Sequence, residues 1–162
     1  MTDRHRLTCE VAAADALFRL EIWGDQAAVE QRLGTALPAP CRSATRDGER
    51  LIWWEPSTWL IRAPSGAVLE IAASDDGAVT EVSGYFRRLR VQGAGWRSLL
   101  MIGGVFDAES PAFAPGCVAA TVIHHLPVWL DVIDPETVDA YTPPSYAAEL
   151  KRHWERAMAR LG

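Results

Sequence analysis

Residues 81–107 contain the stretch that decides the fold, and residues 81–100 read EVSGYFRRLRVQGAGWRSLL. The order of residue types predicts a turn, a strand of alternating character, a corner with two glycines and a short apolar helix. A second glycine pair at 103–104 is expected to end that helix. The stretch therefore predicts a strand that feeds directly into a helix near the middle of the chain.

The strand in this stretch has two unlike faces. Leu89 and Val91 fall on one side, whereas Arg88 and Arg90 fall on the other, because successive side chains of a strand point to opposite faces. We expect the apolar face to be buried and the basic face to be left free for a partner or a ligand.

The composition is that of an ordinary soluble globular protein. The chain has 162 residues, 49% of them hydrophobic and 23% charged, with a formal net charge of −5. A nucleic-acid or anionic-membrane binder needs a clustered basic surface, so the acidic balance argues against both. No apolar run is long enough for a membrane span or a signal peptide, and we expect a cytoplasmic protein. Three widely spaced cysteines predict reduced, buried thiols.

Upstream of the central stretch, the pattern predicts several strands and a helix. The strand-like runs are residues 16–23, 42–46, 50–54, 58–62 and 78–82. A short helix is expected after Asp25, which can cap its start, and Gly34 is suited to end it. The Asp47-Gly48 step is a strong hairpin signal. Residues 65–74 fit a short helix slightly better than a strand.

Downstream, a loop, a strand meander and a long helix are expected. The proline- and glycine-rich residues 108–116 predict the loop. The runs 117–125 and 128–133 are predicted to be strands joined across Leu126-Pro127, and 137–141 a third strand. The final helix should begin at Pro143 or Pro144. Its predicted apolar stripe is Tyr146, Leu150, Trp154, Ala157 and Leu161.

Taken together, the elements predict an α+β fold made of antiparallel strands with helices. The order of elements in the second half approximately repeats that in the first half. We expect one domain over residues 1–162, internally duplicated, with halves of roughly 10–80 and 81–162.

No catalytic residue or metal site is predicted. His124 and His125 are neighbours near a strand end and point to opposite faces, so a surface or interface role is favoured over metal ligation. The acids Asp131, Asp134, Glu136 and Asp139 lack calcium-loop spacing and are expected to be solvated. The corner at 93–95 lacks the third glycine of a dinucleotide loop.

Several motifs in the same order resemble a known family. They are the acid-apolar-serine step Glu81-Val82-Ser83, the basic strand and glycine corner after it, the leucine-glycine-proline run 33–40, the tryptophan-rich run 53–61, the loop 113–117 and the helix start 145–147. This pattern resembles the folate-binding domain of aminomethyltransferases, such as the glycine-cleavage T-protein. It also resembles the gamma subunit of heterotetrameric sarcosine oxidase.

The resemblance implies a duplicated α+β folate-binding-domain fold and a role in a complex. The catalytic acid of aminomethyltransferases has no counterpart between residues 117 and 131. The resemblance therefore implies a non-catalytic small subunit of a sarcosine oxidase, in which sarcosine is oxidatively demethylated. It implies alpha, beta and delta subunits as partners. FAD, FMN, NAD and tetrahydrofolate are expected on those partner subunits and none on this chain.

Two alternatives remain open at this point. The chain can be a stand-alone folate-type ligand-binding protein or small aminomethyltransferase-like protein, with Glu81, Arg88 and Arg90 meeting the ligand. It can also be a homo-oligomeric scaffold. For the subunit hypothesis, the candidate interface residues are Trp59, Trp129 and His124.

Overall fold

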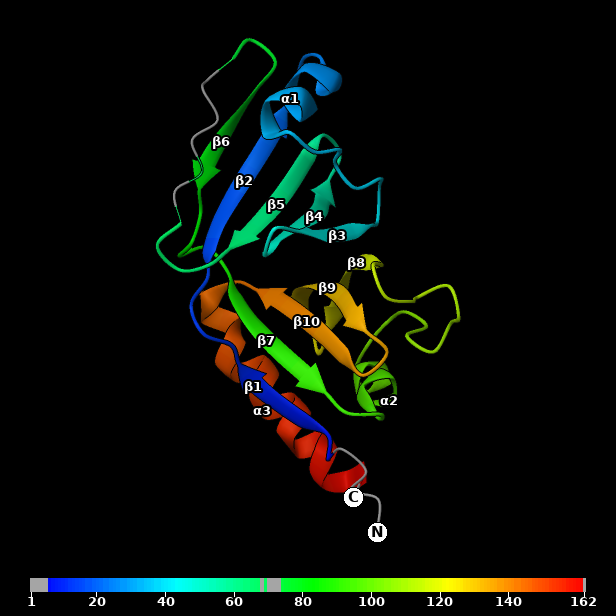
Figure 1. The fold of residues 1–162 in the computed structure, drawn as a ribbon. Coiled ribbons are helices and arrows are strands. Elements are labelled where there is room, and N and C mark those ends of the chain that lie inside the picture. Colours follow the sequence, from blue (N-terminus) through cyan, green and yellow to red (C-terminus); the bar gives the residue numbers. More distant parts are fainter. Residues whose placement is uncertain (1–5, 68, 70–73, 162) are drawn as a thin grey trace. The chain divides into compact units, whose positions relative to one another are not determined.

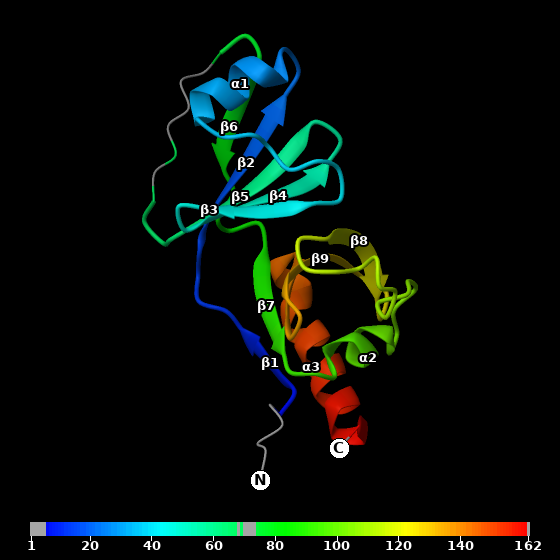
Figure 2. The ribbon, with the colours of Figure 1, turned by 45° about the vertical axis from the view of Figure 1, so that its right-hand side comes forward.

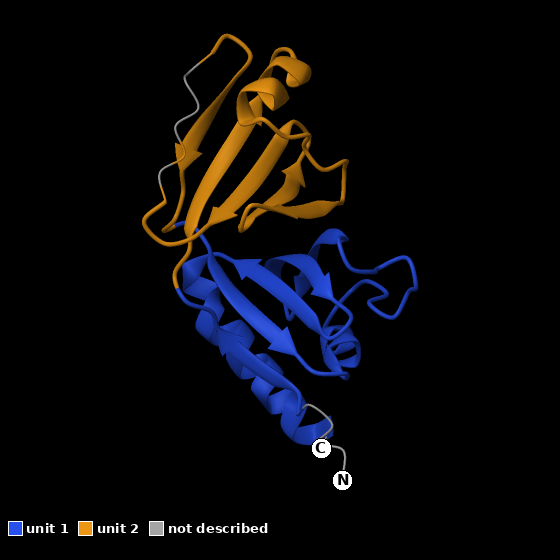
Figure 3. Cartoon of the chain, in the orientation of Figure 1, with its two compact units in different colours: residues 1–13, 85–162 blue, residues 14–84 orange. Residues whose placement is uncertain are grey.

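The computed structural model describes residues 6–67, 69 and 74–161, which form two compact units. One unit contains residues 1–13 and 85–162, and the other contains residues 14–84 (Figure 3). Each unit contains one five-stranded antiparallel sheet (Figure 1). The prediction of an α+β fold with antiparallel sheets is confirmed. The prediction of a single duplicated domain stays a prediction.

The unit of residues 1–13 and 85–162, called unit 1, has strand order β1-β7-β10-β9-β8. Its strands are β1 (Thr8–Val11), β7 (Arg87–Gln92), β8 (Val118–Ile123), β9 (Leu126–Asp134) and β10 (Thr137–Thr142). Its helices are α2 (Trp96–Met101) and α3 (Pro144–Leu161). The N-terminal strand β1 pairs with β7, about eighty residues further along the chain. This long-range pairing assigns the two ends of the chain to the same unit.

Both helices of unit 1 cover the apolar face of its sheet (Figures 1 and 2). Leu89 and Val91 of β7 are fully buried in this core, as their alternation predicts. Helix α3 contributes Ala147, Leu150, Trp154 and Ala157 to it. The predicted stripe was wrong at its ends, because Tyr146 and Leu161 are exposed at the two ends of the helix.

The unit of residues 14–84, called unit 2, has strand order β3-β4-β5-β2-β6. Its strands are β2 (Ala16–Ile22), β3 (Ser43–Arg46), β4 (Glu49–Glu55), β5 (Thr58–Ala63) and β6 (Gly77–Glu81). Its helix is α1 (Gln26–Leu33), which buries Val29 against the core of this sheet.

Local signals in unit 2 were predicted correctly. The Asp25 carboxylate accepts a hydrogen bond from the Ala27 N–H at 2.9 Å, and Gly34 ends α1 in the left-handed region at φ 67°. Asp47 and Gly48 both have positive φ, at 48° and 84°, which is the conformation of a two-residue type I′ hairpin turn. The predicted helix over 65–74 falls largely on residues 68 and 70–73, which lie outside the described residues.

The turn between β8 and β9 was placed wrongly. It consists of His124 and His125, at φ 49° and 67°, whereas Leu126 and Pro127 belong to β9. Pro127 is tolerated in the sheet because the ladder between β9 and β10 reaches only to Trp129, so its missing N–H removes no strand hydrogen bond.

Two tryptophans in the core of unit 1 give a matched pair for a stability test. Both are fully buried, but the Trp96 indole N–H donates to the Pro135 carbonyl at 2.9 Å, whereas no hydrogen-bond acceptor for the Trp154 N–H occurs among the described residues. Replacing either by phenylalanine removes a similar volume. Trp96→Phe also removes a hydrogen bond, whereas Trp154→Phe removes a buried donor that has no acceptor among the described residues.

We therefore expect Trp96→Phe to destabilise the protein by about 1–3 kcal/mol more than Trp154→Phe. Urea unfolding of both variants measures the difference. Equal losses of stability would show that the Pro135 contact contributes nothing.

Candidate functional site

The basic face of β7 is the predicted site, and it is occupied by a buried carboxylate of the neighbouring strand. The Asp139 side chain of β10 has no solvent exposure. It accepts two parallel hydrogen bonds from Arg90, Nε to Oδ1 at 2.7 Å and Nη2 to Oδ2 at 2.8 Å. Arg88 Nη1 donates to the same Oδ2 at 3.2 Å. One carboxylate thus joins two guanidinium groups, and the Arg90 contact has the planar two-point geometry of a strong ion pair.

The strand register explains this cluster. Arg90 lies directly opposite Asp139 in the ladder, and Arg88 lies two residues further along β7 on the same face. The prediction that the basic face is left free was therefore wrong. The charge that the sequence presents on β7 is neutralised inside unit 1 by a residue about fifty positions away.

Two of the four acids predicted to be solvated are instead fully buried. Asp131 of β9 lies opposite Asp139 across the ladder, and both side chains are inaccessible to solvent. Asp134 and Glu136 are exposed as expected, and the Asp134 carboxylate accepts from the Glu136 N–H in the turn. Alternation along β10 was the available signal, since it places Asp139 on the face opposite the apolar Val138 and Ala140.

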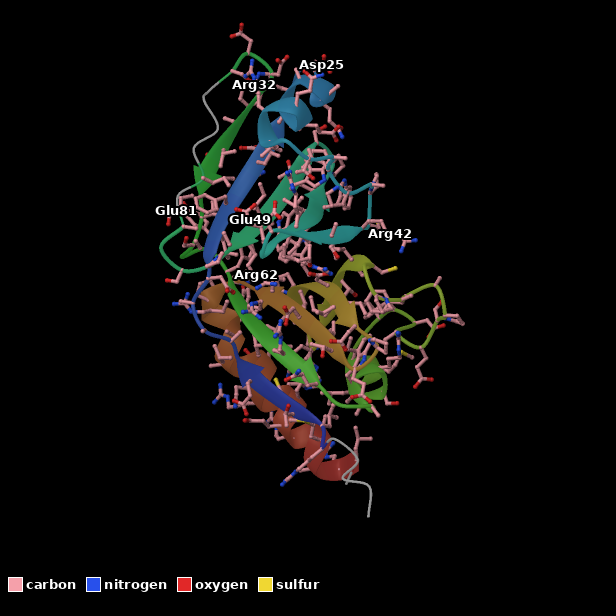
Figure 4. The ribbon with its side chains drawn as sticks, in the orientation of Figure 1. Asp25, Arg32, Arg42, Glu49, Arg62 and Glu81 are labelled. Atoms are coloured by element: carbon pink, nitrogen blue, oxygen red, sulfur yellow. The ribbon has the colours of Figure 1, made fainter. Side chains whose placement is uncertain are left out.

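Glu81 has a local structural role that does not involve the two arginines. It ends β6 in unit 2 (Figure 4), where its Oε1 accepts from the Ser83 hydroxyl at 2.8 Å. The Ser83 oxygen in turn accepts from the Leu17 N–H at 3.1 Å. The hydrogen bonds of Ser83 with Glu81 and Leu17 thus link the segment after β6 to the start of β2. Glu81 belongs to unit 2, while Arg88 and Arg90 belong to unit 1.

The candidate interface residues have unlike surroundings. Trp59 is buried in the core of unit 2, and its indole N–H donates to the Pro38 carbonyl at 3.0 Å. Trp129 on β9 is half-buried and packs edge-to-face on Phe86, with ring centroids 5.6 Å apart. Trp59 thus has a structural role within its unit, and Trp129 retains partial exposure.

His124 lies at a junction of three segments in unit 1. Its ring stacks on that of His153 of α3 with centroids 4.3 Å apart, and its backbone N–H donates to the Gly103 carbonyl at 3.0 Å. His124 Nε2 is 3.9 Å from a carboxylate oxygen of Glu149. The histidine therefore holds the β8–β9 turn against α3, with its side chain partly exposed.

Each unit has a groove of a size suited to a small molecule. In unit 1, a groove of about 760 Å³ is lined by apolar residues such as Leu7 and Met158, with Arg6, Ser98 and Glu155 beside them. In unit 2, a groove of about 530 Å³ is lined by prolines and by Trp53 and Trp59. Neither groove includes Glu81, Arg88 or Arg90, so the structure brings the predicted ligand residues to neither of them.

The cysteines differ in exposure. Cys9 and Cys117 are buried, whereas Cys41 is exposed, so the prediction of buried thiols was wrong for Cys41. Burial raises the pKa of Cys9 to about 12, with a smaller opposing effect of the Lys151 ammonium. Lys151 is itself paired with Glu155, whose hydrogen bond raises the Lys151 pKa.

Thiol labelling tests this arrangement. We expect the native protein to incorporate one equivalent of a thiol reagent rapidly and three in denaturant, because the thiolate is the reactive form and only Cys41 is accessible. Cys41→Ser removes the fast phase. A fast phase that persists in this variant would contradict the assignment.

The raised pKa of Cys9 also predicts a loss of stability at alkaline pH. The folded state keeps this proton while the unfolded chain loses it near pH ~8.5, so the contribution is complete below that pH. It is lost as the pH rises toward the folded value of about 12. Chemical unfolding of the wild type and of Cys9→Ala across this range should show a shallower decline in the variant. Parallel declines would contradict the assignment.

Metal clusters and membrane-spanning helices are both absent from the described residues. No group of three or more His, Cys, Asp or Glu side chains suited to a metal ion occurs among them. None of the helices in the described part of the chain is long and apolar enough to cross a membrane.

Within the described residues, two antiparallel sheets and three helices define an α+β architecture. No family model matches the sequence, and no curated protein matches it. The fold, however, matches a chain in a solved structure, that of heterotetrameric sarcosine oxidase from Corynebacterium sp. U-96 in complex with pyrrole 2-carboxylate. The TM-score is 0.83 at 18% sequence identity, and the match covers 98% of this chain and 87% of that chain. This protein therefore has the fold of a chain of heterotetrameric sarcosine oxidase, as the motif order predicted.

Proposed function

We propose that this chain is a non-catalytic small subunit of a multi-subunit sarcosine oxidase that oxidatively demethylates sarcosine. The observation that carries the proposal is the match to a chain of such an enzyme over nearly the whole length of this protein.

The contacts of the candidate ligand residues support a structural contribution. Arg88 and Arg90 are held by Asp139, and Glu81 is held by Ser83. A ligand of the two arginines would have to compete with the buried Asp139 carboxylate, whereas Glu81 is exposed and makes only a local contact. Breaking a buried ion pair is costly, which disfavours such an exchange.

In this proposal, the larger alpha and beta subunits and the delta subunit are the partners, in the cytoplasm. FAD, FMN, NAD and tetrahydrofolate belong to those subunits, and this chain binds none of them. Its contribution is to pack against a larger subunit, with Trp129 and His124 as partly exposed anchors.

Co-purification from the source organism tests the proposal. A tagged copy of the chain, recovered under mild conditions, should carry flavin absorbance and sarcosine-dependent oxygen consumption in the same fractions. A matched preparation of the tag on an unrelated protein is the control. Recovery of the tagged chain without a flavoprotein would contradict the proposal.

The rival function of a folate-type binder is disfavoured because Arg88 and Arg90 are already bound to Asp139. Calorimetric titration of the isolated chain with tetrahydrofolate should give no saturable binding. Saturable binding that is lost in Arg90→Ala would overturn the assignment and favour the rival.

A further inference from the structure

The stacked imidazole rings of His124 and His153 join three segments of unit 1. His124 lies in the β8–β9 turn and His153 lies on α3, with ring centroids 4.3 Å apart and 13° between the ring planes. His153 Nε2 is 2.9 Å from the carbonyl oxygen of Ile102, the residue that follows α2. The end of α2, the turn and α3 therefore meet at one pair of titratable rings.

The two rings are held in different ways. A carbonyl oxygen can only accept a hydrogen bond, so His153 carries a proton on Nε2 in both its neutral and its charged form. A second proton on that ring goes to Nδ1 and leaves this bond in place. The ring of His124 makes no hydrogen bond within the described part of the chain, and a carboxylate oxygen of Glu149 lies 3.9 Å from its Nε2. The His124 side chain, which is 38% exposed, is thus held mainly by the stack.

The turn that contains His124 has a backbone conformation that few side chains adopt. The φ angles of His124 and His125 are 49° and 67°, in the left-handed region. Tertiary contacts must therefore hold the turn in this shape. They are the ring stack and the hydrogen bond from the His124 N–H to the Gly103 carbonyl at 3.0 Å, beside the bridge between Gly104 and Ile123. Loss of the stack removes one of these contacts.

The charged groups around the stack do not balance two added positive charges. On α3, Glu149 and Arg156 lie one turn before and one turn after the stacked histidine, on the same side of the helix. In the turn, the ring of His125 lies 5.8 Å from that of His124. Residues 99–106, at the end of α2 and after it, include no charged side chain. One carboxylate thus faces up to three imidazolium groups and a guanidinium group.

We infer that the His124–His153 stack is a pH-sensitive switch that releases the β8–β9 turn in acid. Imidazole is the side chain whose charge ordinarily changes between about pH 5 and 8. One proton on the pair creates no repulsion between the rings, and the Glu149 carboxylate favours it. A proton on each ring places two positive charges about 4.3 Å apart. Because His153 stays bound to Ile102, the His124 ring leaves and the turn opens away from α3.

Hydrogen exchange of the full chain, resolved by residue with NMR, measures the opening. Between about pH 7.5 and 5.5, the protection factor of the His124 amide should fall about tenfold or more, after correction for the intrinsic exchange rate. Two unit charges at this distance near a protein surface are sufficient for an effect of that size. The amides that pair β7 with β10 should keep their protection, because the opening is local.

Two variants remove the switch, and each preserves a different feature of the fold. His124→Asn replaces the titrating ring by a side chain that tolerates positive φ. His153→Gln keeps an N–H donor for the Ile102 carbonyl but cannot take a charge. In both variants, the protection of the turn should be the same at the two pH values. His125→Asn is the matched control in the same turn, and it should show the wild-type loss because its ring lies outside the stack.

Unchanged protection of the wild-type turn at about pH 5.5 would overturn the inference. So would a pH-dependent loss that persists in either His124→Asn or His153→Gln, or one that His125→Asn abolishes. The result is independent of the proposed function, because the experiment uses this chain alone.

Discussion

Replacing Asp139 by alanine is expected to lower the free energy of unfolding by about 3–5 kcal/mol. The carboxylate is fully buried and joins Arg88 and Arg90. Its removal breaks both of these pairs, and breaking a pair with a buried partner costs far more than losing a surface pair. Chemical unfolding monitored by tryptophan fluorescence measures the loss.

The control is Asp134→Ala, an exposed acid at the end of β9 whose carboxylate accepts one backbone hydrogen bond. Its cost should stay below about 1 kcal/mol. A double-mutant cycle of Asp139→Ala with Arg90→Ala should give a coupling energy of about 1–3 kcal/mol, because the two side chains are in direct contact. A loss below ~1 kcal/mol for Asp139→Ala would contradict the structural role of the cluster.

Gly104→Ala is expected to destabilise unit 1 by about 1–3 kcal/mol or more. A methyl group at this position would overlap the Leu100 carbonyl at the end of α2, a backbone atom that cannot rotate away. Gly104 also bridges Ile123, so a backbone shift here disturbs both the end of α2 and the bridge to β8. Thermal unfolding of the variant checks the direction and the size.

Gly84→Ala is the matched control. Nothing lies within 4 Å of the position that its methyl group would occupy. We expect its stability to be unchanged or slightly higher, because alanine restricts the unfolded chain. Equal effects of the two substitutions would show that the contact with Leu100 does not constrain this glycine.

The elements that were predicted correctly depend on short-range chemistry. The Asp47-Gly48 turn, the Asp25 and Gly34 caps and the alternation in β7 each involve residues within a few positions of one another. Their conformations follow from which backbone angles and hydrogen bonds those residues allow. Such features can be deduced from one sequence.

The misplaced turn shows where local rules fail. Proline is usually the stronger turn signal, and a histidine with positive φ is uncommon, so the pair 126–127 was favoured over 124–125. The structure favours the histidines because the ring of His124 packs on His153 and its N–H binds Gly103. Both partners are distant in the sequence.

The candidate site was predictable only in part. The sequence predicts that Arg88 and Arg90 form a basic face. Their ion-pair partner, however, depends on β10 lying beside β7, a pairing between residues about fifty positions apart. Without the strand order, Asp139 is predicted to be one of several solvated acids. The resemblance of the motifs indicated the architecture, and the register determined what the charged residues do.

Native mass spectrometry of the tagged chain purified from its source organism tests the central claim most directly. The subunit proposal predicts that the 17.8 kDa chain is found in a complex with larger flavin-carrying subunits, and is released from it as an intact chain on activation. Detection of the chain solely as a free protomer or as copies of itself, in a preparation where sarcosine oxidation elutes separately, would contradict the account.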